Sequence, residues 1–289
     1  MSAVLGDTPG PRGRHRIAMA SIVASIALAL AVLIALRRLA GAGELDAAKW
    51  RLLTQPQVAR FLLGGLANTL RAAAVGLLLA GILGTVLALG RLSRSLPFRL
   101  AAGGYVEFFR AYPLLILVIF AFYGLPKLGV NLPPYWALVL ALTAYNGAVL
   151  GEIFRAGIQS LERGQAEAAA ALGLRHWQAM RLVILPQAFR RMIPTIVSQA
   201  VTLLKDTSLG YAVGFEELLR RSLIAGDFGK DPLQALTAAA VIYLAVNFTL
   251  SRVARHLEVR QRRRYRAGDI RVAGAEDLEA VAAAASMPR

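Results

Sequence analysis

The chain has 289 residues, of which 57% are hydrophobic and 17% are charged, and its formal net charge is +16. Soluble proteins typically have about 45–50% apolar and about 25% charged residues, so this composition excludes a disordered chain and argues against a soluble globular one. The absence of cysteine excludes disulfides, thiolate metal sites, iron–sulfur clusters and cysteine nucleophiles. The three histidines are far apart in the sequence, so we expect no metal site and no cofactor.

Apolar runs along the chain predict an all-α integral membrane protein. A spanning helix needs roughly 20 apolar residues, because the hydrocarbon core is about 30 Å thick. We assign six spans, at 17–40, 66–90, 105–125, 135–154, 192–215 and 233–252. A cleaved signal peptide is the alternative for the first span. Its uncharged stretch of 20 residues is longer than the roughly 7–15 residues of a signal-peptide core.

The basic residues predict how the chain crosses the membrane. With both termini in the cytoplasm, the inside segments hold 21 Lys and Arg residues and the outside segments hold 9. Lys and Arg collect in cytoplasmic loops, so this arrangement is the expected one. Segment 37–60 holds five of the outside residues and is a local exception. The positive charge is therefore mainly a topology signal, and we expect the lipid bilayer, with no nucleic acid, as partner; nucleic-acid binding by the Arg-rich run 260–266 is the alternative.

Residues 158–186, in the longest inside loop, predict a helix, a glycine turn and a second helix. Apolar side chains recur at helical spacing on both sides of Gly173. Glycine accepts the left-handed backbone that closes a helix, so the first helix should end there. Pro186 should mark the return of the chain to the membrane. The alternative is a pair of interfacial helices that rest on lipid.

This loop resembles the EAA loop of the inner-membrane subunits of binding-protein-dependent ABC importers. The matching residues are Glu167-Ala168-Ala169, Gly173 and Val183-Ile184-Leu185-Pro186, with Val183 where the family usually has Ile. Flanking motifs resemble the polar-amino-acid branch of that family, and they are Tyr105-Val106-Glu107-Phe108-Phe109-Arg110, Pro113-Leu114-Leu115, Gly151-Glu152-Ile153-Phe154-Arg155, Arg163-Gly164-Gln165 and Leu203-Leu204-Lys205-Asp206-Thr207-Ser208. The extra first span is similar to that of glutamate-uptake permeases of this branch.

The resemblance implies the fold of a type I ABC importer transmembrane domain over residues 65–255, with a five-span core. The domain would follow a cytoplasmic tail (1–16), an extra first span (17–40) and an extracytoplasmic linker (41–64), and it would precede a basic, Ala-rich tail (256–289). The resemblance also implies a multi-pass location in the bacterial inner membrane.

The same resemblance implies the partners and the coupling residues. In such importers the EAA loop docks on a pair of ATPase subunits, a second permease subunit (a homologue or the same chain) completes the pathway, and an extracytoplasmic binding protein delivers a polar amino acid, here glutamate or a related one. The coupling residues would be Glu167, Ala168, Ala169, Gly173, Leu185 and Pro186. The sequence has no G-x-x-x-x-G-K-[S/T] phosphate loop, so ATP hydrolysis is expected from the partner.

Ionisable and polar residues within the predicted spans are candidates for the substrate pathway or for gating, because such groups are expensive at membrane depth. They are Glu107, Arg110, Asn146, Glu152, Arg155, Lys205, Asp206, Thr207 and Ser208. The pairs Glu107/Arg110 and Glu152/Arg155 are three residues apart and could pair on one helix face, or simply hold helix ends at the interface. Adjacent Lys205 and Asp206 predict a helix break or separate partners.

Three other classes of membrane protein fit the sequence less well. An intramembrane enzyme would show H-E-x-x-H, G-x-S-x-G or paired intramembrane aspartates, and none is present. A membrane sensor would need a folded output domain, which the 23 residues after Arg266 cannot build. A secondary transporter would show paired internal repeats, which we do not find.

Overall fold

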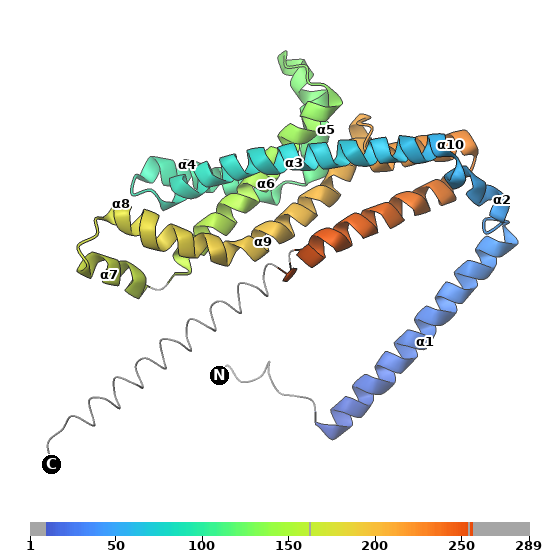
Figure 1. Ribbon diagram of the computed structural model, residues 1–289, viewed down its shortest axis with the longest axis horizontal. Coiled ribbons are helices and arrows are strands. Elements are labelled where there is room, and N and C mark those ends of the chain that lie inside the picture. The colour runs from blue at the N-terminus through green and yellow to red at the C-terminus, as the bar shows by residue number, and fades with distance from the viewer. Residues whose placement is uncertain (1–9, 162, 254, 257–289) are drawn as a thin grey trace.

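The computed structural model describes residues 10–161, 163–253 and 255–256, and every regular element in them is helical (Figure 1). The helices are α1 (Pro11–Gly41), α2 (Ala47–Trp50), α3 (Pro56–Leu92), α4 (Leu96–Ala111), α5 (Leu114–Ile119), α6 (Pro134–Gln159), α7 (Arg163–Ala171), α8 (His176–Ala179), α9 (Leu185–Asp206), α10 (Leu218–Gly229) and a last helix, Pro232–Val253. The Arg-rich run 260–266 and nearly all of the predicted tail 256–289 lie outside the described residues, and the domain boundaries stay predictions.

Four helices of the described chain are long and apolar enough to cross a membrane, namely α1, α3, α6 and the last helix. A fifth span results if α4 and the segment from α5 to Leu128 count as one, although the two are bent by 102°. The sixth predicted span, 192–215, coincides with α9 and a 3-10 segment (Thr207–Val213). Charged and polar residues lower the hydropathy of α9, so the count of six is not confirmed.

The predicted span 105–125 is not one straight helix. It begins earlier, at Leu96, and breaks at Tyr112, whose backbone is extended with ψ 134°. Pro113 explains the break, because proline disfavours the α conformation of the residue before it and has no N–H to donate. The bend turns α5 away from α4, which places Arg110 at the corner.

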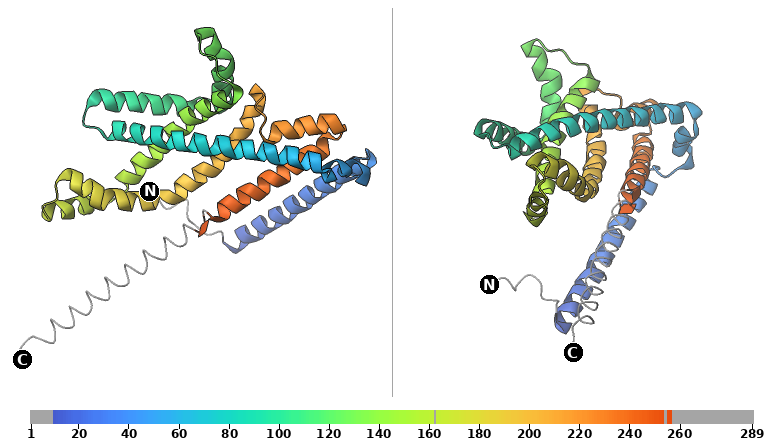
Figure 2. Two further views of the ribbon diagram at one scale, coloured as in Figure 1. Left: turned by 45° about the horizontal axis from the view of Figure 1, so that its top comes forward. Right: turned by 60° about the vertical axis from the view of Figure 1, so that its left-hand side comes forward.

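The core is built where α3 crosses α6 (Figure 2). Gly84 of α3 meets Gly147 and Gly151 of α6, and a Cβ on Gly84 would lie 2.9 Å from the backbone nitrogen of Gly151. Gly147 and Gly151 are spaced four apart, so both lie on the face of α6 that meets α3. Close backbone approach between small residues is a common way to join helices in membranes.

Replacing Gly84 with leucine is expected to lower the free energy of unfolding by about 2–3 kcal/mol, because the added side chain has no space at the crossing. Gly81, one turn earlier on α3, provides the matched control, since a Cβ added there would have no atom within 4 Å. Thermal unfolding of the two variants in one detergent would test this. Equal melting temperatures for Gly84→Leu and Gly81→Leu would contradict the close approach.

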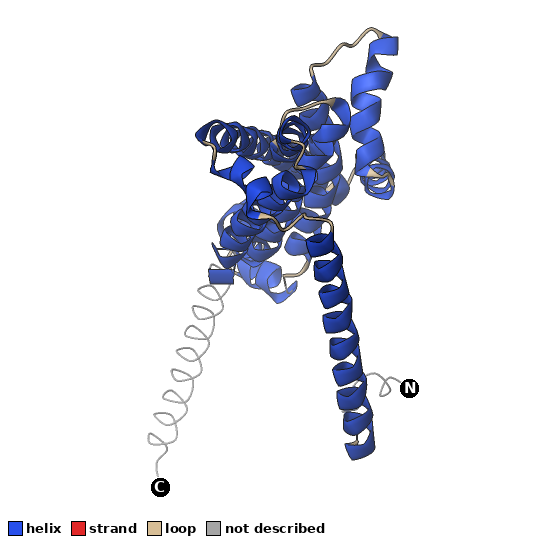
Figure 3. Cartoon of the chain, turned by 90° about the vertical axis from the view of Figure 1, so that its right-hand side faces the viewer, coloured by secondary structure: helices blue, strands red, loops and turns tan. Residues whose placement is uncertain are grey.

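Helix α1 stands apart from the bundle (Figure 3), and none of its most apolar 18-residue window is buried. The segment after it is attached to the core. Gln234 donates to the Glu44 carbonyl at 2.8 Å, and Lys49 pairs with the Glu44 carboxylate at 2.6 Å, which lowers the pKa of Glu44. Leu52 is buried in an apolar cluster with α10 and the last helix. An apolar helix that no other part of the described chain covers is expected to be surrounded by lipid. The linker after it is held to the core by the contacts of Glu44 and Leu52.

Candidate functional site

The predicted helix–glycine–helix loop is confirmed, and it lies at the end of the bundle opposite to α2 and α10 (Figure 1). Gly173 has φ +75°, in the left-handed region. Its N–H donates to the Ala170 carbonyl at 2.9 Å, and the N–H of Leu174 donates to the Ala169 carbonyl at 3.1 Å. These two bonds close α7 as a Schellman motif. The local sequence therefore sets the turn between α7 and α8.

The second half of this loop differs from the prediction. A π-helical segment, Met180–Ile184, joins α8 to α9 without a loop, and Pro186 lies in the first turn of α9. Proline is tolerated there because the first N–H groups of a helix have no partner within it. The chain therefore continues through Leu185 and Pro186 in one direction, and no turn marks a return to the membrane.

The candidate coupling residues divide into buried and exposed positions. Ala169 is 2% exposed, whereas Glu167 and Ala168 are exposed. Two side-chain bonds hold the loop to its surroundings: Gln187 to Gln165 at 3.2 Å, and Arg191 to the Ser160 carbonyl at 3.1 Å. Glu167 is therefore available to a partner, while Ala169 seats α7.

Large apolar side chains are exposed on the same loop. Leu172 is 81% exposed, Trp177 is 66% exposed and Leu182 is 64% exposed. The helical spacing of apolar residues predicts that each of these helices has an apolar side that needs cover. Exposed apolar groups in a loop that also carries an exposed carboxylate are typical of a surface that contacts another protein or lipid.

The two predicted ion pairs have different outcomes. Glu152 pairs with Arg155 at 2.5 Å, as predicted, and also with Arg91 at the end of α3 at 2.6 Å. In the described chain Glu107 and Arg110 form no ion pair, although they lie three residues apart. No sequence pattern indicated Arg91, because its partner lies 61 residues away and meets it only through the crossing of α3 and α6.

Arg110 instead lines a cavity of about 400 Å³ together with Asp206. The other residues that line it are Leu114, Tyr145, Val149, Gln199 and Thr202. Asn146, which is fully buried, accepts a hydrogen bond from Gln199 at 2.7 Å and so orients that side chain. Asn146 and Gln199 thus form a hydrogen bond between α6 and α9, a common role of polar residues in membrane helices. The cavity holds one cationic and one acidic side chain from α4 and α9, whereas Glu107 lies outside it.

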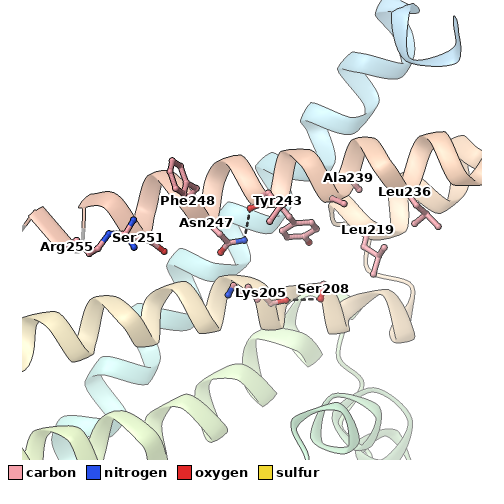
Figure 4. Close-up of a pocket in the computed structure, with 12 residues that line it drawn as sticks. Lys205, Ser208, Leu219, Leu236, Ala239, Tyr243, Asn247, Phe248, Ser251 and Arg255 are labelled. Atoms are coloured by element: carbon pink, nitrogen blue, oxygen red, sulfur yellow. Dashed lines mark hydrogen bonds between the residues drawn. The ribbon is translucent and has the colours of Figure 1, made fainter. Parts of the chain in front are cut away.

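The predicted helix break after Lys205 and Asp206 is confirmed. Helix α9 ends at Asp206 and a 3-10 segment follows. The two side chains separate: Asp206 lines the cavity with Arg110, while Lys205 and Ser208 line a different groove beside the last helix (Figure 4). Thr207 is buried and donates to the Leu204 carbonyl at 2.7 Å. The four consecutive polar residues therefore do not form one site.

Apolar helices long enough to cross a membrane, a projecting helix–glycine–helix loop and a cavity lined by Arg110 and Asp206 are together typical of a membrane transport subunit. The chain belongs to the family of binding-protein-dependent transport system inner membrane components, which matches residues 80–263. Its fold is that of the type I ABC importer permeases, as the sequence had led us to expect.

Similar proteins are amino-acid permeases. The glutamate transport system permease protein GluD of Corynebacterium glutamicum is 40% identical over 239 residues, which cover 81% of this chain and 85% of GluD. The probable glutamine ABC transporter permease protein GlnP of Bacillus subtilis is 38% identical over 206 residues, 70% of this chain and 94% of GlnP. A crystal structure of an amino acid ABC transporter with histidines has a TM-score of 0.68 at 32% identity, covering 73% of this chain and 98% of that one.

Proposed function

We propose that this chain is the permease subunit of an ATP-driven importer of polar amino acids, with glutamate as the foremost substrate. The cavity with Arg110 and Asp206 is the observation that carries the proposal. An amino acid has a carboxylate and an ammonium group, and this cavity offers each of them a side chain of opposite charge. The relatives named for glutamate and glutamine transport support the same class of cargo.

The partners follow from the family. A pair of ATPase subunits would hydrolyse ATP, because the sequence has no phosphate loop of its own. A second permease subunit, either a homologue or another copy, would complete the pathway, and an extracytoplasmic binding protein would deliver the substrate. The protein would lie in the bacterial inner membrane with both termini in the cytoplasm, an orientation that the distribution of 21 inside and 9 outside basic residues supports.

The α7–α8 loop would transmit the movement of the ATPase pair. Exposed Glu167 would make the charged contact, and Leu172 and Trp177 would be covered on docking. Because α8 continues through Leu185 and Pro186 into α9, a displacement of the loop would move α9 as a rigid body. The far end of α9 carries Asp206, so the same movement would reach the charged cavity.

Uptake of labelled glutamate tests the cavity. Asp206→Asn keeps the shape and removes the charge that would hold the ammonium group, and a hydrogen bond to a charged group contributes about 1.5–3 kcal/mol. We therefore expect uptake at low glutamate concentration to fall about tenfold or more. Arg110→Gln should have a similar effect.

Asp227→Asn is the matched control, since Asp227 is exposed on α10 and lines neither the cavity nor the groove. Uptake by each variant must be divided by the amount of protein inserted in the membrane. Unchanged uptake in both Asp206→Asn and Arg110→Gln would refute the role of the cavity.

A further inference from the structure

A long groove runs between α9 and the last helix, apart from the charged cavity (Figure 4). It consists of two adjoining hollows of about 600 Å³ and about 310 Å³, which share Lys205, Ser251 and Arg255. The groove is open on one side because the rest of the described chain covers little of the last helix. Leu244 is 69% exposed and Phe248 is 54% exposed.

The larger hollow has a mostly apolar wall. Its apolar lining residues are Leu219, Leu236, Ala239, Ala240, Leu244 and Phe248. From Leu244 to Arg255 the helix rises about 16 Å. This is about half of a hydrocarbon core of roughly 30 Å, which is the depth of one leaflet.

The smaller hollow is polar and cationic. Lys205 and Arg255 line it together with three hydroxyl groups, from Ser198, Thr202 and Ser251, and no carboxylate of the described residues does. In the described chain neither basic side chain makes a hydrogen bond or an ion pair. Asp206, the acidic residue nearest in sequence to Lys205, lines the other cavity. Lys205 lies beside Asn247 and Tyr243, and Arg255 lies at the end of the groove (Figure 4). Two basic groups and several hydroxyl groups beside an apolar wall suit an amphiphile with an anionic head.

We propose that this groove binds one anionic phospholipid, with an acyl chain along the wall and the phosphate between Lys205 and Arg255. A zwitterionic amino acid suits the groove less well, because no carboxylate in the described part of the chain lines it to receive the ammonium group. Arg255 lies near the end of the described part of the last helix, which the proposed orientation places at the cytoplasmic surface. Anionic lipids are enriched in that leaflet and attract basic residues near it. The assignment rests on the proposed orientation but not on the identity of the transported amino acid.

Native mass spectrometry of the full-length chain tests the site. The protein is extracted from nanodiscs of phosphatidylcholine containing about one fifth phosphatidylglycerol, and the retained lipid is counted. We expect one phosphatidylglycerol per chain. Arg255→Gln should weaken its retention about fivefold, which corresponds to about 1 kcal/mol for one basic residue near the surface. Ala240→Trp should also weaken lipid retention, because the larger side chain would occupy the space of the larger hollow.

Arg252→Gln is the matched control. Arg252 lies one turn from Arg255 on the same helix, but its guanidinium covers the Phe248 ring at 4.5 Å and does not line the groove. Equal loss of lipid in Arg252→Gln and Arg255→Gln would overturn the proposal, since it would show general surface attraction. Displacement of the lipid by inorganic phosphate or by glutamate would overturn it as well.

The absence of native cysteine allows one more test. A disulfide between two copies of Ala240→Cys would show that a second chain, and not lipid, covers the groove. Failure of the proposed substrate cavity would appear differently, as normal glutamate uptake in Asp206→Asn with lipid retention unchanged.

Discussion

Replacing Gly173 with valine is expected to abolish ATP-driven uptake while the protein still inserts in the membrane. The φ angle of Gly173 is +75°, and no atom lies within 4 Å of a Cβ placed there. A larger side chain at position 173 is therefore opposed by the left-handed backbone conformation, and not by a lack of space. A left-handed conformation costs an L-residue about 1–2 kcal/mol, and it is least tolerated by β-branched residues such as valine.

The expected damage is local. If residue 173 leaves the left-handed region, the hydrogen bonds to the Ala169 and Ala170 carbonyls that close α7 are lost. The angle between α7 and α8 then changes. The spans do not depend on this turn, so insertion should be normal. Uptake of labelled glutamate and ATPase activity of the assembled transporter would be measured together. We expect uptake to be abolished, and ATP hydrolysis to be uncoupled from it.

Gly164→Val is the control for this prediction. Gly164 lies in α7, has no positive φ and has no atom within 4 Å of a Cβ. The same change of side chain there should leave uptake near normal. Gly173→Asn should be intermediate, because asparagine adopts the left-handed conformation more readily than other residues. Normal uptake in Gly173→Val would show that the angle of this turn does not transmit force.

The loop could be predicted from the sequence because its determinants are local. A run of alanines favours a helix, a glycine ends it, and the apolar spacing continues beyond. The pairing of Glu152 with Arg155 is local in the same way. The bend at Pro113 also had a local cause, although we had expected one span from 105 to 125.

Contacts between distant segments could not be predicted. Arg110 was expected to pair with Glu107, but the bend after α4 turns it toward Asp206, which is 96 residues later in the chain. The sequence also grouped Lys205 with Asp206, and their adjacency on a helix is the reason that they face different hollows. Spacing along one helix gives the direction of a side chain, whereas its partner depends on how helices cross.

Glu217 is a residue that sequence reasoning missed, and its replacement should have the largest effect on stability. It is fully buried outside the predicted spans, at the N-cap of α10. Its carboxylate accepts hydrogen bonds from the N–H groups of Leu219 at 2.8 Å and Arg220 at 2.7 Å, and from the Tyr243 hydroxyl at 2.7 Å. The side chain therefore joins α10 to the last helix, and nearby Thr69 accepts a bond from Leu218 at 3.1 Å, which joins α10 to α3.

Glu217→Ala is expected to lower the free energy of unfolding by about 3 kcal/mol. Three part-buried donors would lose their acceptor, and each such loss costs about 1 kcal/mol. The lost N-cap is part of the same cost. Thermal or chemical unfolding in one detergent would measure it. Glu217→Gln should cost less, because its amide oxygen still accepts from one or two of the donors.

Glu216→Ala separates this contribution from a general effect of removing charge. The Glu216 carboxylate pairs with Arg221 at 3.2 Å, but its side chain is 53% exposed. Exposed ion pairs contribute about 0–1 kcal/mol, so this neighbouring variant should unfold almost like the unaltered protein. Equal destabilisation by the two alanine variants would mean that the buried bonds of Glu217 are not what holds α10 to the last helix. A large difference would show that one buried carboxylate joins α10 to the last helix through its three hydrogen bonds.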